Sequence, residues 1–177
     1  MERYLQLFYY AYLRLECSDS IINSNNIFNL IKEGKDEKDI INLKRILGSA
    51  DLILATELLI RSIVLYDKNK NGIEIKEEDY FKPYHNIKKL IKKEEINHIL
   101  FKYGLNEFIK NWQNCTGCNF YDFLPNTGDY NNIRFVDCDN GKISIDKINL
   151  CSHLCKFLFE KADSLYNNNN NNVSNIC

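Results

Sequence analysis

The sequence predicts an all-α protein, an antiparallel helical bundle with one small β-hairpin near residues 133–145. Three observations favour this fold class. Only 7 glycines and 2 prolines interrupt a chain of 177 residues, so few breakers oppose long helices. Hydrophobic residues make up 45% of the chain, which is enough to build a core. Along much of the chain they recur at steps of three and four, the spacing of one helix face.

Two segments are expected before the central helix. A first helix over about residues 2–16 carries an apolar stripe at steps of three and four, formed by Leu5, Phe8, Tyr12 and Leu15. A weaker apolar stretch over residues 21–31 follows, and Gly34 is the kind of residue that ends a helix.

The clearest helix spans about residues 37–66. Its apolar residues lie along two lines, which predicts burial on two sides and a place at the centre of the bundle. Glu57 and Arg61 interrupt this apolar surface. They are spaced i,i+4 with the acid first, the order that favours an ion pair along a helix.

A polar loop over residues 67–83 separates this helix from two shorter ones. The first is expected over residues 85–93. The second is expected over residues 95–113, with Gly104 weakening its middle by about 1 kcal/mol relative to alanine. Its apolar contacts are Ile99, Phe101, Tyr103, Leu105, Phe108 and Trp112.

The predicted hairpin centres on Asn140-Gly141, which supplies the two positive-φ positions of a type I′ turn. The last helix is expected over residues 146–166. Its stripe at steps of three and four is Ile148, Cys151, Cys155, Leu158, Ala162 and Leu165. We therefore expect a single helical domain over residues 1–166. Residues 167–177 form an asparagine-rich tail that has little to bury, so we expect it to be disordered.

Charge and hydropathy narrow the class of protein. A formal net charge of −1 excludes a chain that coats a polyanion over its whole surface, while local basic faces remain open. The chain has no run of about 18 apolar residues, and its start lacks the features of a signal peptide. We therefore expect a cytoplasmic protein that makes no membrane contact. Its odd count of seven cysteines leaves at least one unpaired, so a secreted disulfide framework is not expected, and reduced thiols follow from the expected compartment.

We expect no cofactor, but two metal sites stand as alternatives. In the first, Asp67, Asn69 and Asn71 occupy positions one, three and five of a calcium-loop pattern, with Gly72 at six and Glu78 at twelve. These residues offer a hard cation oxygen ligands, a sharp turn and a bidentate carboxylate. The competing interpretation is an ordinary solvated loop between two helices.

The second alternative is a zinc site. Cys115 and Cys118 have the spacing of a zinc knuckle, and further cysteines lie downstream. Cys151 and Cys155 share the apolar stripe of the last helix, where small core residues are equally expected.

A cluster of basic residues lies in the segment HNIKKLIKK, residues 85–93. Lys88, Lys89, Lys92 and Lys93 lie opposite the apolar residues of the same segment. An ordinary solvated helix face accounts for this pattern, and so does a short strip that contacts RNA.

Three short motifs occur in one order along the chain. ATELLIR at residues 55–61 is similar to A-x-E-x-x-x-K, and HNIKKL at residues 85–90 is similar to H-x-[LI]-x-x-L. NIRF at residues 132–135 resembles an arginine-aromatic step before a last helix. Together they resemble the HEPN superfamily over about residues 38–166.

This resemblance implies an antiparallel helical bundle that forms a homodimer. Many HEPN proteins cleave RNA as toxins of toxin–antitoxin pairs or as antiviral abortive-infection factors, and others bind nucleotides or partners. Catalytic members use an arginine followed about four to six residues later by a histidine. The guanidinium stabilises the charge of the phosphorane, and the imidazole moves a proton. His85, His98 and His153 are the three histidines here, and none follows an arginine at that spacing.

The resemblance therefore favours a noncatalytic or atypical member that acts in RNA- or defence-linked regulation, through dimerisation and binding of RNA or a cognate protein. An atypical ribonuclease would use a polar cluster of Glu57, Arg61, His85 and Arg134. The competing interpretation makes Glu57 and Arg61 a buried structural ion pair. A metal-binding regulatory protein and an interaction protein without chemistry remain alternative classes.

Overall fold

A computed structural model describes residues 2–23, 37–75, 87–114 and 145–173 of the chain. Six helices are described within these ranges, and no strand occurs in them. The helices are α1 (Arg3–Asn23), α3 (Glu37–Lys70), α5 (Ile87–Ile91), α6 (Glu94–Lys102), α7 (Asn106–Asn114) and α8 (Ile145–Val173). The all-α class is thus confirmed for these residues, while the predicted hairpin lies almost wholly outside them.

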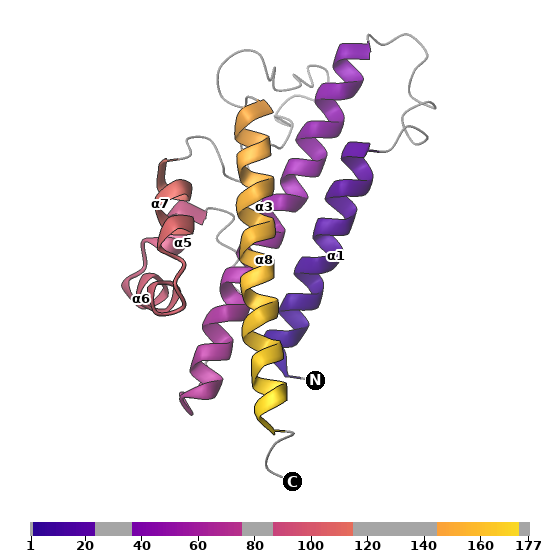
Figure 1. Cartoon of the computed structure of the whole chain (residues 1–177). Helices are drawn as coiled ribbons and strands as arrows, with labels where there is room; N and C mark the ends of the chain where they lie inside the picture. Colours follow the sequence, from indigo (N-terminus) through magenta and orange to yellow (C-terminus); the bar gives the residue numbers. More distant parts are fainter. Residues whose placement is uncertain (1, 24–36, 76–86, 115–144, 174–177) are drawn as a thin grey trace.

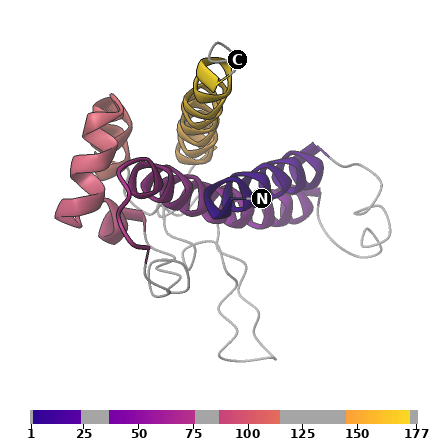
Figure 2. The ribbon, with the colours of Figure 1, turned by 90° about the horizontal axis from the view of Figure 1, so that it is seen from below.

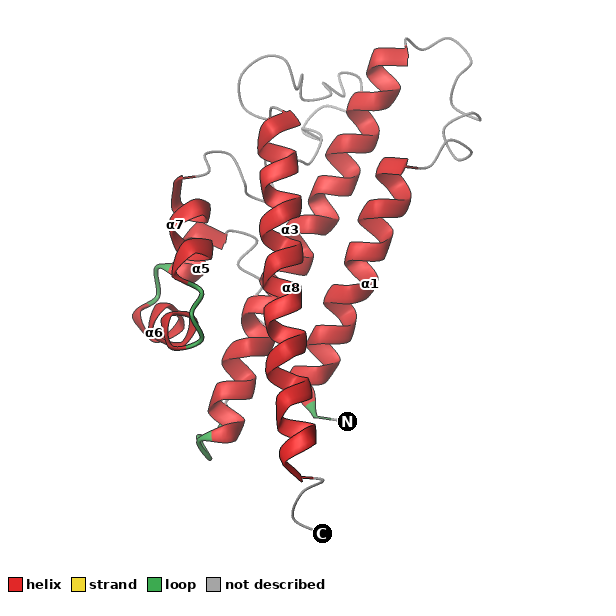
Figure 3. Ribbon diagram, viewed as in Figure 1, coloured by secondary structure: helices red, strands yellow, loops and turns green. Residues whose placement is uncertain are grey.

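Three long helices, α1, α3 and α8, make up most of the fold, and the short helices α5, α6 and α7 gather beside α3 (Figures 1 and 3). Seen along the bundle, α1 and α3 lie side by side, and α8 lies across one face of that pair (Figure 2). None of the described helices is long and apolar enough to cross a membrane.

Helix α3 is the centre of the bundle, as its two apolar lines predict. Between Leu52 and Lys68 almost every side chain is buried, whichever way it faces. Helices α1, α8, α5 and α6 all pack against it. Ser18 of α1 donates a buried hydrogen bond to the Gly48 carbonyl of α3 at 2.8 Å, which ties the two helices together where they cross.

The chain directions differ from the expected antiparallel arrangement. Helix α1 runs opposite to α3, but α8 runs in the same direction as α3 (Figure 1). Cys155 lies against the Leu52 carbonyl, and further along both helices Tyr166 bonds Ser62. The chain between α3 and α8 is long enough to return to the starting end of the bundle, and such a crossover permits parallel neighbours.

The helix expected over residues 95–113 is two helices in the structure. Gly104 has a φ of 73°, so α6 ends before it and α7 begins after it. The Leu105 N–H bonds the Leu100 carbonyl and the Gly104 N–H bonds the Phe101 carbonyl, both at 3.0 Å. This is the Schellman pattern that ends a helix at a left-handed glycine. The break also corrects one expected contact, because the side chain of Phe101 is 61% exposed.

Two other helix bounds differ from expectation. Helix α1 continues to Asn23, well past residue 16. Its buried stripe is Phe8, Ala11, Leu15 and Ser18, while Tyr12 is 43% exposed. Helix α8 continues to Val173, so residues 167–173 are helical where a disordered tail was expected. Propensity alone disfavours asparagine in a helix, but intrinsic propensity is a weak preference that a long packed helix can override.

Replacing Gly104 with alanine is expected to destabilise the protein by about 1–2 kcal/mol, because an L-residue with a side chain is strained at a left-handed position. Asparagine tolerates that conformation better, so Gly104→Asn should lose less stability. Urea unfolding followed by circular dichroism measures both changes. Equal stability of the alanine variant and the parent would contradict the break between α6 and α7.

Candidate functional site

Glu57 and Arg61 form the ion pair that their spacing on α3 predicts. Arg61 Nη2 donates to Glu57 Oε1 at 2.8 Å, and Arg61 Nε donates to the same oxygen at 3.0 Å. The Arg61 side chain is only 8% exposed, and the Glu57 side chain is 5% exposed. His85 and Arg134, the other members of the candidate cluster, lie outside the described residues, so their approach to this pair stays a prediction.

The position of this pair suits a structural role. Its charges neutralise each other inside a helix that is covered on nearly every side. A buried ion pair costs desolvation, and removing one partner leaves an uncompensated charge in the core. Each of the two side chains therefore supplies the other with a bonding partner of opposite charge in the core. This arrangement is the one expected of a structural ion pair.

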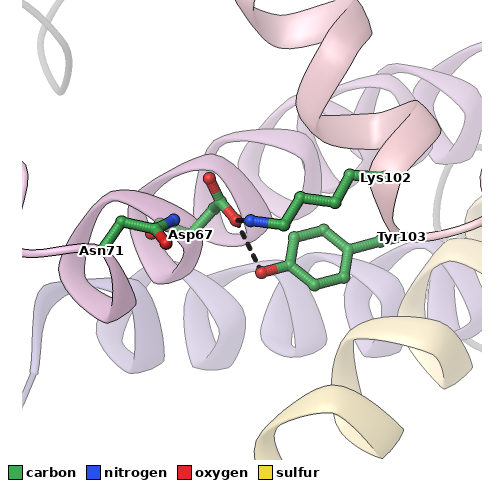
Figure 4. Close-up of polar contacts among 4 residues, drawn as sticks. All are labelled: Asp67, Asn71, Lys102 and Tyr103. Atoms are coloured by element: carbon green, nitrogen blue, oxygen red, sulfur yellow. Dashed lines mark hydrogen bonds and ion pairs between the residues drawn. The ribbon is translucent and has the colours of Figure 1, made fainter.

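A second polar cluster joins α3 to α6 (Figure 4). Asp67 Oδ1 accepts hydrogen bonds from Lys102 Nζ at 2.6 Å and from Tyr103 Oη at 2.7 Å. The Asp67 side chain is 7% exposed, whereas that of Lys102 is 45% exposed. The buried carboxylate thus attaches the end of α6 to the last turns of α3 through one charged and one neutral donor.

This cluster differs from the calcium loop that the sequence pattern suggested. Asp67 and Asn69 lie within helix α3, and the Asn69 amide donates to Glu2 at 2.9 Å. The Asn71 amide donates to the backbone carbonyl of Asp67 at 2.7 Å. These three residues therefore make contacts within the bundle and at the end of α3. Glu78, the fourth candidate ligand, lies outside the described residues.

Gly72, which the pattern placed at the sharp turn, has another role. It has a φ of 64°, and its N–H bonds the Asn69 carbonyl while the Ile73 N–H bonds the Lys68 carbonyl. This is the same Schellman ending that Gly104 gives α6. Both a calcium loop and a helix end require a glycine with positive φ, which explains why the pattern fitted.

The zinc alternative is only partly covered by the structure. Cys115 and Cys118 lie outside the described residues. Cys151 and Cys155 are completely buried in α8, as expected for small core residues, and burial raises the pKa of each thiol to about 12. In the described ranges no group of three or more histidine, cysteine, aspartate or glutamate side chains is placed to hold a metal ion.

The lysine strip lies on α5 and the turn that follows it. Ile87, Leu90 and Ile91 are fully buried, while Lys89, Lys92 and Lys93 are exposed and Lys88 is half-buried. The predicted division of this segment into an apolar and a basic face is thus confirmed.

Sequence reasoning missed a cluster of tyrosines where α1, α3 and α8 meet. The rings of Tyr4, Tyr66 and Tyr166 have centroids 5.0 to 5.3 Å apart. Ser62 Oγ donates to the Tyr4 carbonyl at 2.6 Å and bonds Tyr166 Oη at 2.6 Å. Burial raises the pKa of Tyr4 to about 12, and it also raises the pKa of Tyr166. No sequence signal joins these residues, because each comes from a different helix.

Removing one member of the buried ion pair is expected to be costly. Glu57→Leu or Arg61→Met alone should destabilise the protein by about 3–5 kcal/mol, because the remaining charge stays buried. The double variant should recover most of that loss, since two apolar side chains can replace a buried pair. Urea unfolding of the four proteins forms a double-mutant cycle, and additive losses would show that the pair is not coupled.

Asp67 is expected to make folding sensitive to acid. Burial by itself raises the pKa of this carboxyl, but hydrogen bonds from Lys102 and Tyr103 outweigh it, so the pKa lies below its ordinary value of 3.8. The stabilisation is therefore complete above pH 3.8 and is lost as the pH falls through the lowered pKa. Asp67→Asn should be less stable at neutral pH and should lose less stability on acidification.

Thermal unfolding of the parent and of Asp67→Asn, followed from about pH 2 to about pH 7, measures this difference. Asp51→Asn is the matched control, because Asp51 also accepts from a cation, Arg14, at 2.7 Å but with an Arg14 side chain that is 51% exposed. A parent and an Asp67→Asn variant with parallel acid profiles would contradict the role of the Asp67 carboxylate.

Comparisons with known proteins return no match of any kind: no family model, no curated protein and no solved structure is similar to this chain. The HEPN resemblance therefore stays a prediction that depends on three short motifs, of which the structure describes one completely, at residues 55–61.

Proposed function

We propose that this chain is a noncatalytic, HEPN-like helical module that binds RNA through the strip formed by Lys88, Lys89, Lys92 and Lys93. The observation that carries the proposal is the placement of four lysines within six residues at the surface of α5 and the turn after it. Lysine binds phosphate as a point charge, so such a strip suits a nucleic-acid backbone and reads no particular base.

The apolar side of α5 supports this use of its basic side. Ile87, Leu90 and Ile91 fix the helix against its neighbours, and α5 packs against α3, α6 and α7. The helix is too short to be stable by itself, so tertiary packing must hold it. That packing keeps the lysines together at one surface, and RNA binding need not order this segment.

Acidic neighbours limit the strength that we expect. Glu94 and Glu95 follow the strip directly at the start of α6. Glu95 is bonded to Lys68 at 3.0 Å, which offsets part of its charge. With a net chain charge of −1, only this local strip favours a polyanion, so binding should be weak and sensitive to salt.

The noncatalytic part of the proposal is supported by the Glu57–Arg61 pair. Both side chains are buried, and they are bonded to each other. A group that stabilises charge on a reacting phosphate must lie within hydrogen-bond distance of that phosphate. The pair is not exposed for such contact, so we assign it to stability and leave RNA binding to the surface.

Lys89→Glu combined with Lys92→Glu is expected to weaken RNA binding by about tenfold or more at low salt, since each change replaces a cation with an anion. The slope of log K against log salt should become shallower by about 0.7 for each phosphate that the variant no longer neutralises. Fluorescence anisotropy with a labelled single-stranded RNA measures both quantities. The matched control is Lys110→Glu with Lys161→Glu, which alters the net charge equally at exposed sites on α7 and α8.

Equal weakening by the two double variants would contradict a specific strip. RNA incubated with the pure protein should also stay intact. Cleavage that disappears in His85→Ala or Arg134→Ala would overturn the noncatalytic assignment and favour the atypical ribonuclease.

A further inference from the structure

The end of helix α3 carries an asparagine followed by a glycine. Asn71 and Gly72 form this pair, and both residues are exposed. An asparagine before a glycine is especially prone to deamidation, because the glycine nitrogen can attack the asparagine side chain without hindrance from a side chain of its own. The pair is therefore able to undergo a modification that needs no enzyme.

Deamidation at this pair proceeds through a cyclic intermediate. The Gly72 nitrogen loses its proton and bonds Asn71 Cγ, the bond from Cγ to Nδ2 breaks, and ammonia leaves. Water then opens the resulting succinimide ring at either of its carbonyl carbons. The product is an aspartate or an isoaspartate, whose backbone runs through the former side chain. Water is the co-reactant, and no electrons are transferred.

The folded ending of α3 holds both reacting groups apart. The Gly72 N–H donates to the Asn69 carbonyl at 3.1 Å, so this nitrogen keeps its proton. The Asn71 amide donates to the Asp67 carbonyl at 2.7 Å, and its side chain therefore points back toward Asp67 (Figure 4). Attack of the nitrogen on the amide breaks both bonds, so the reaction requires the last turn of α3 to open.

Deamidation places a carboxylate where negative charge is unfavourable. Burial raises the pKa of the Asp67 carboxyl, and hydrogen bonds from its donors, the Asn71 side chain among them, lower it below its ordinary value. A carboxylate has no proton to donate, so the bond from residue 71 is lost and repulsion replaces it. The C-terminal end of a helix also carries partial negative charge, which opposes a second acid there.

The cations near this turn already have other contacts. Lys68 is bonded to Glu95 at 3.0 Å, and the Lys70 nitrogen lies 5.9 Å from the centre of the Tyr66 ring. A carboxylate at position 71 has to compete for them. Asp67 attaches α6 to α3, so repulsion beside it acts on the contact between these two helices.

We propose that Asn71-Gly72 is a spontaneous deamidation site that the ending of α3 keeps closed, and that its reaction weakens the attachment of α6 to α3. The product does not return to asparagine, so an opening of the last turn can become permanent. The proposal does not depend on RNA binding, because the reacting groups lie at the end of α3 and the lysine strip lies on α5 and the turn after it.

Peptide mass spectrometry after incubation in mildly alkaline buffer tests the closed site. Asn71 should deamidate more slowly in the folded protein than in urea, by about tenfold or more, because the rate follows the small population of the open helix end. In urea it should react about as fast as Asn140, which also precedes a glycine. Equal rates for Asn71 in the folded and the unfolded chain overturn the proposal. An Asn71 that stays intact in urea while Asn140 reacts also overturns it.

A proline after the pair tests whether the helix end controls the rate. Ile73→Pro removes the N–H that bonds the Lys68 carbonyl at 2.9 Å and leaves both reacting residues unchanged. The Ile73 side chain is 51% exposed, so its loss costs little packing. The variant should deamidate faster than the parent under folding conditions and equally fast in urea. A folded variant that reacts no faster than the parent overturns control by the helix end.

Asn71→Asp tests the consequence of the reaction. It should shift the midpoint of urea unfolding to a lower concentration, because the new carboxylate lies beside Asp67 at a helix end. Asn106→Asp is the matched control and should not lower the midpoint, since an acid is favourable at the start of α7. The shift should be smaller in an Asp67→Asn background, which lacks the opposing carboxylate. An Asn71→Asp protein as stable as the parent, or an equal shift in both backgrounds, overturns the weakened attachment.

Discussion

Burial of helix α3 on nearly every side is the constraint on which the other features of the structure depend. A helix with apolar residues all round must be covered all round, and no single neighbour can do so. Helices α1 and α8 cover two of its sides, and α5 and α6 contact it as well. The short helices α5 and α6 therefore help to bury α3, and this packing fixes where they lie at the surface.

The polar groups of α3 show how that burial is tolerated. Glu57 and Arg61 neutralise each other, Ser62 bonds groups of α1 and α8, and Asp67 bonds two side chains at the end of α6. Each of these four side chains has partners, as most buried polar groups do. The partners of Ser62 and Asp67 belong to other helices, so these bonds also fix how neighbouring helices sit on α3. Glu57 and Arg61, two members of the candidate reactive cluster, thus serve the packing, and the basic surface of α5 is where we propose that RNA binds.

Patterns within one helix could be predicted, and contacts between helices could not. The i,i+4 pair on α3, the buried cysteines of α8 and the two faces of α5 all follow from helical spacing. Gly104 and Gly72 show the limit of such reasoning. Each occupies a Schellman ending, yet Gly104 was expected inside a continuous helix and Gly72 in a polar loop that was either a calcium site or an ordinary connection. The sequence pattern does not reveal which carbonyls accept from the N–H groups at a helix end.

The sequence by itself determined that the chain is helical, that α3 lies at the centre and which side of each helix is apolar, because these properties depend on residues a few positions apart. Tertiary structure decided the rest. It placed α8 parallel to α3, joined Tyr4, Tyr66 and Tyr166 in one cluster, and gave Asp67 a lysine and a tyrosine as hydrogen-bond donors. These outcomes depend on which distant residues meet, and that is determined only when all the apolar faces are buried together.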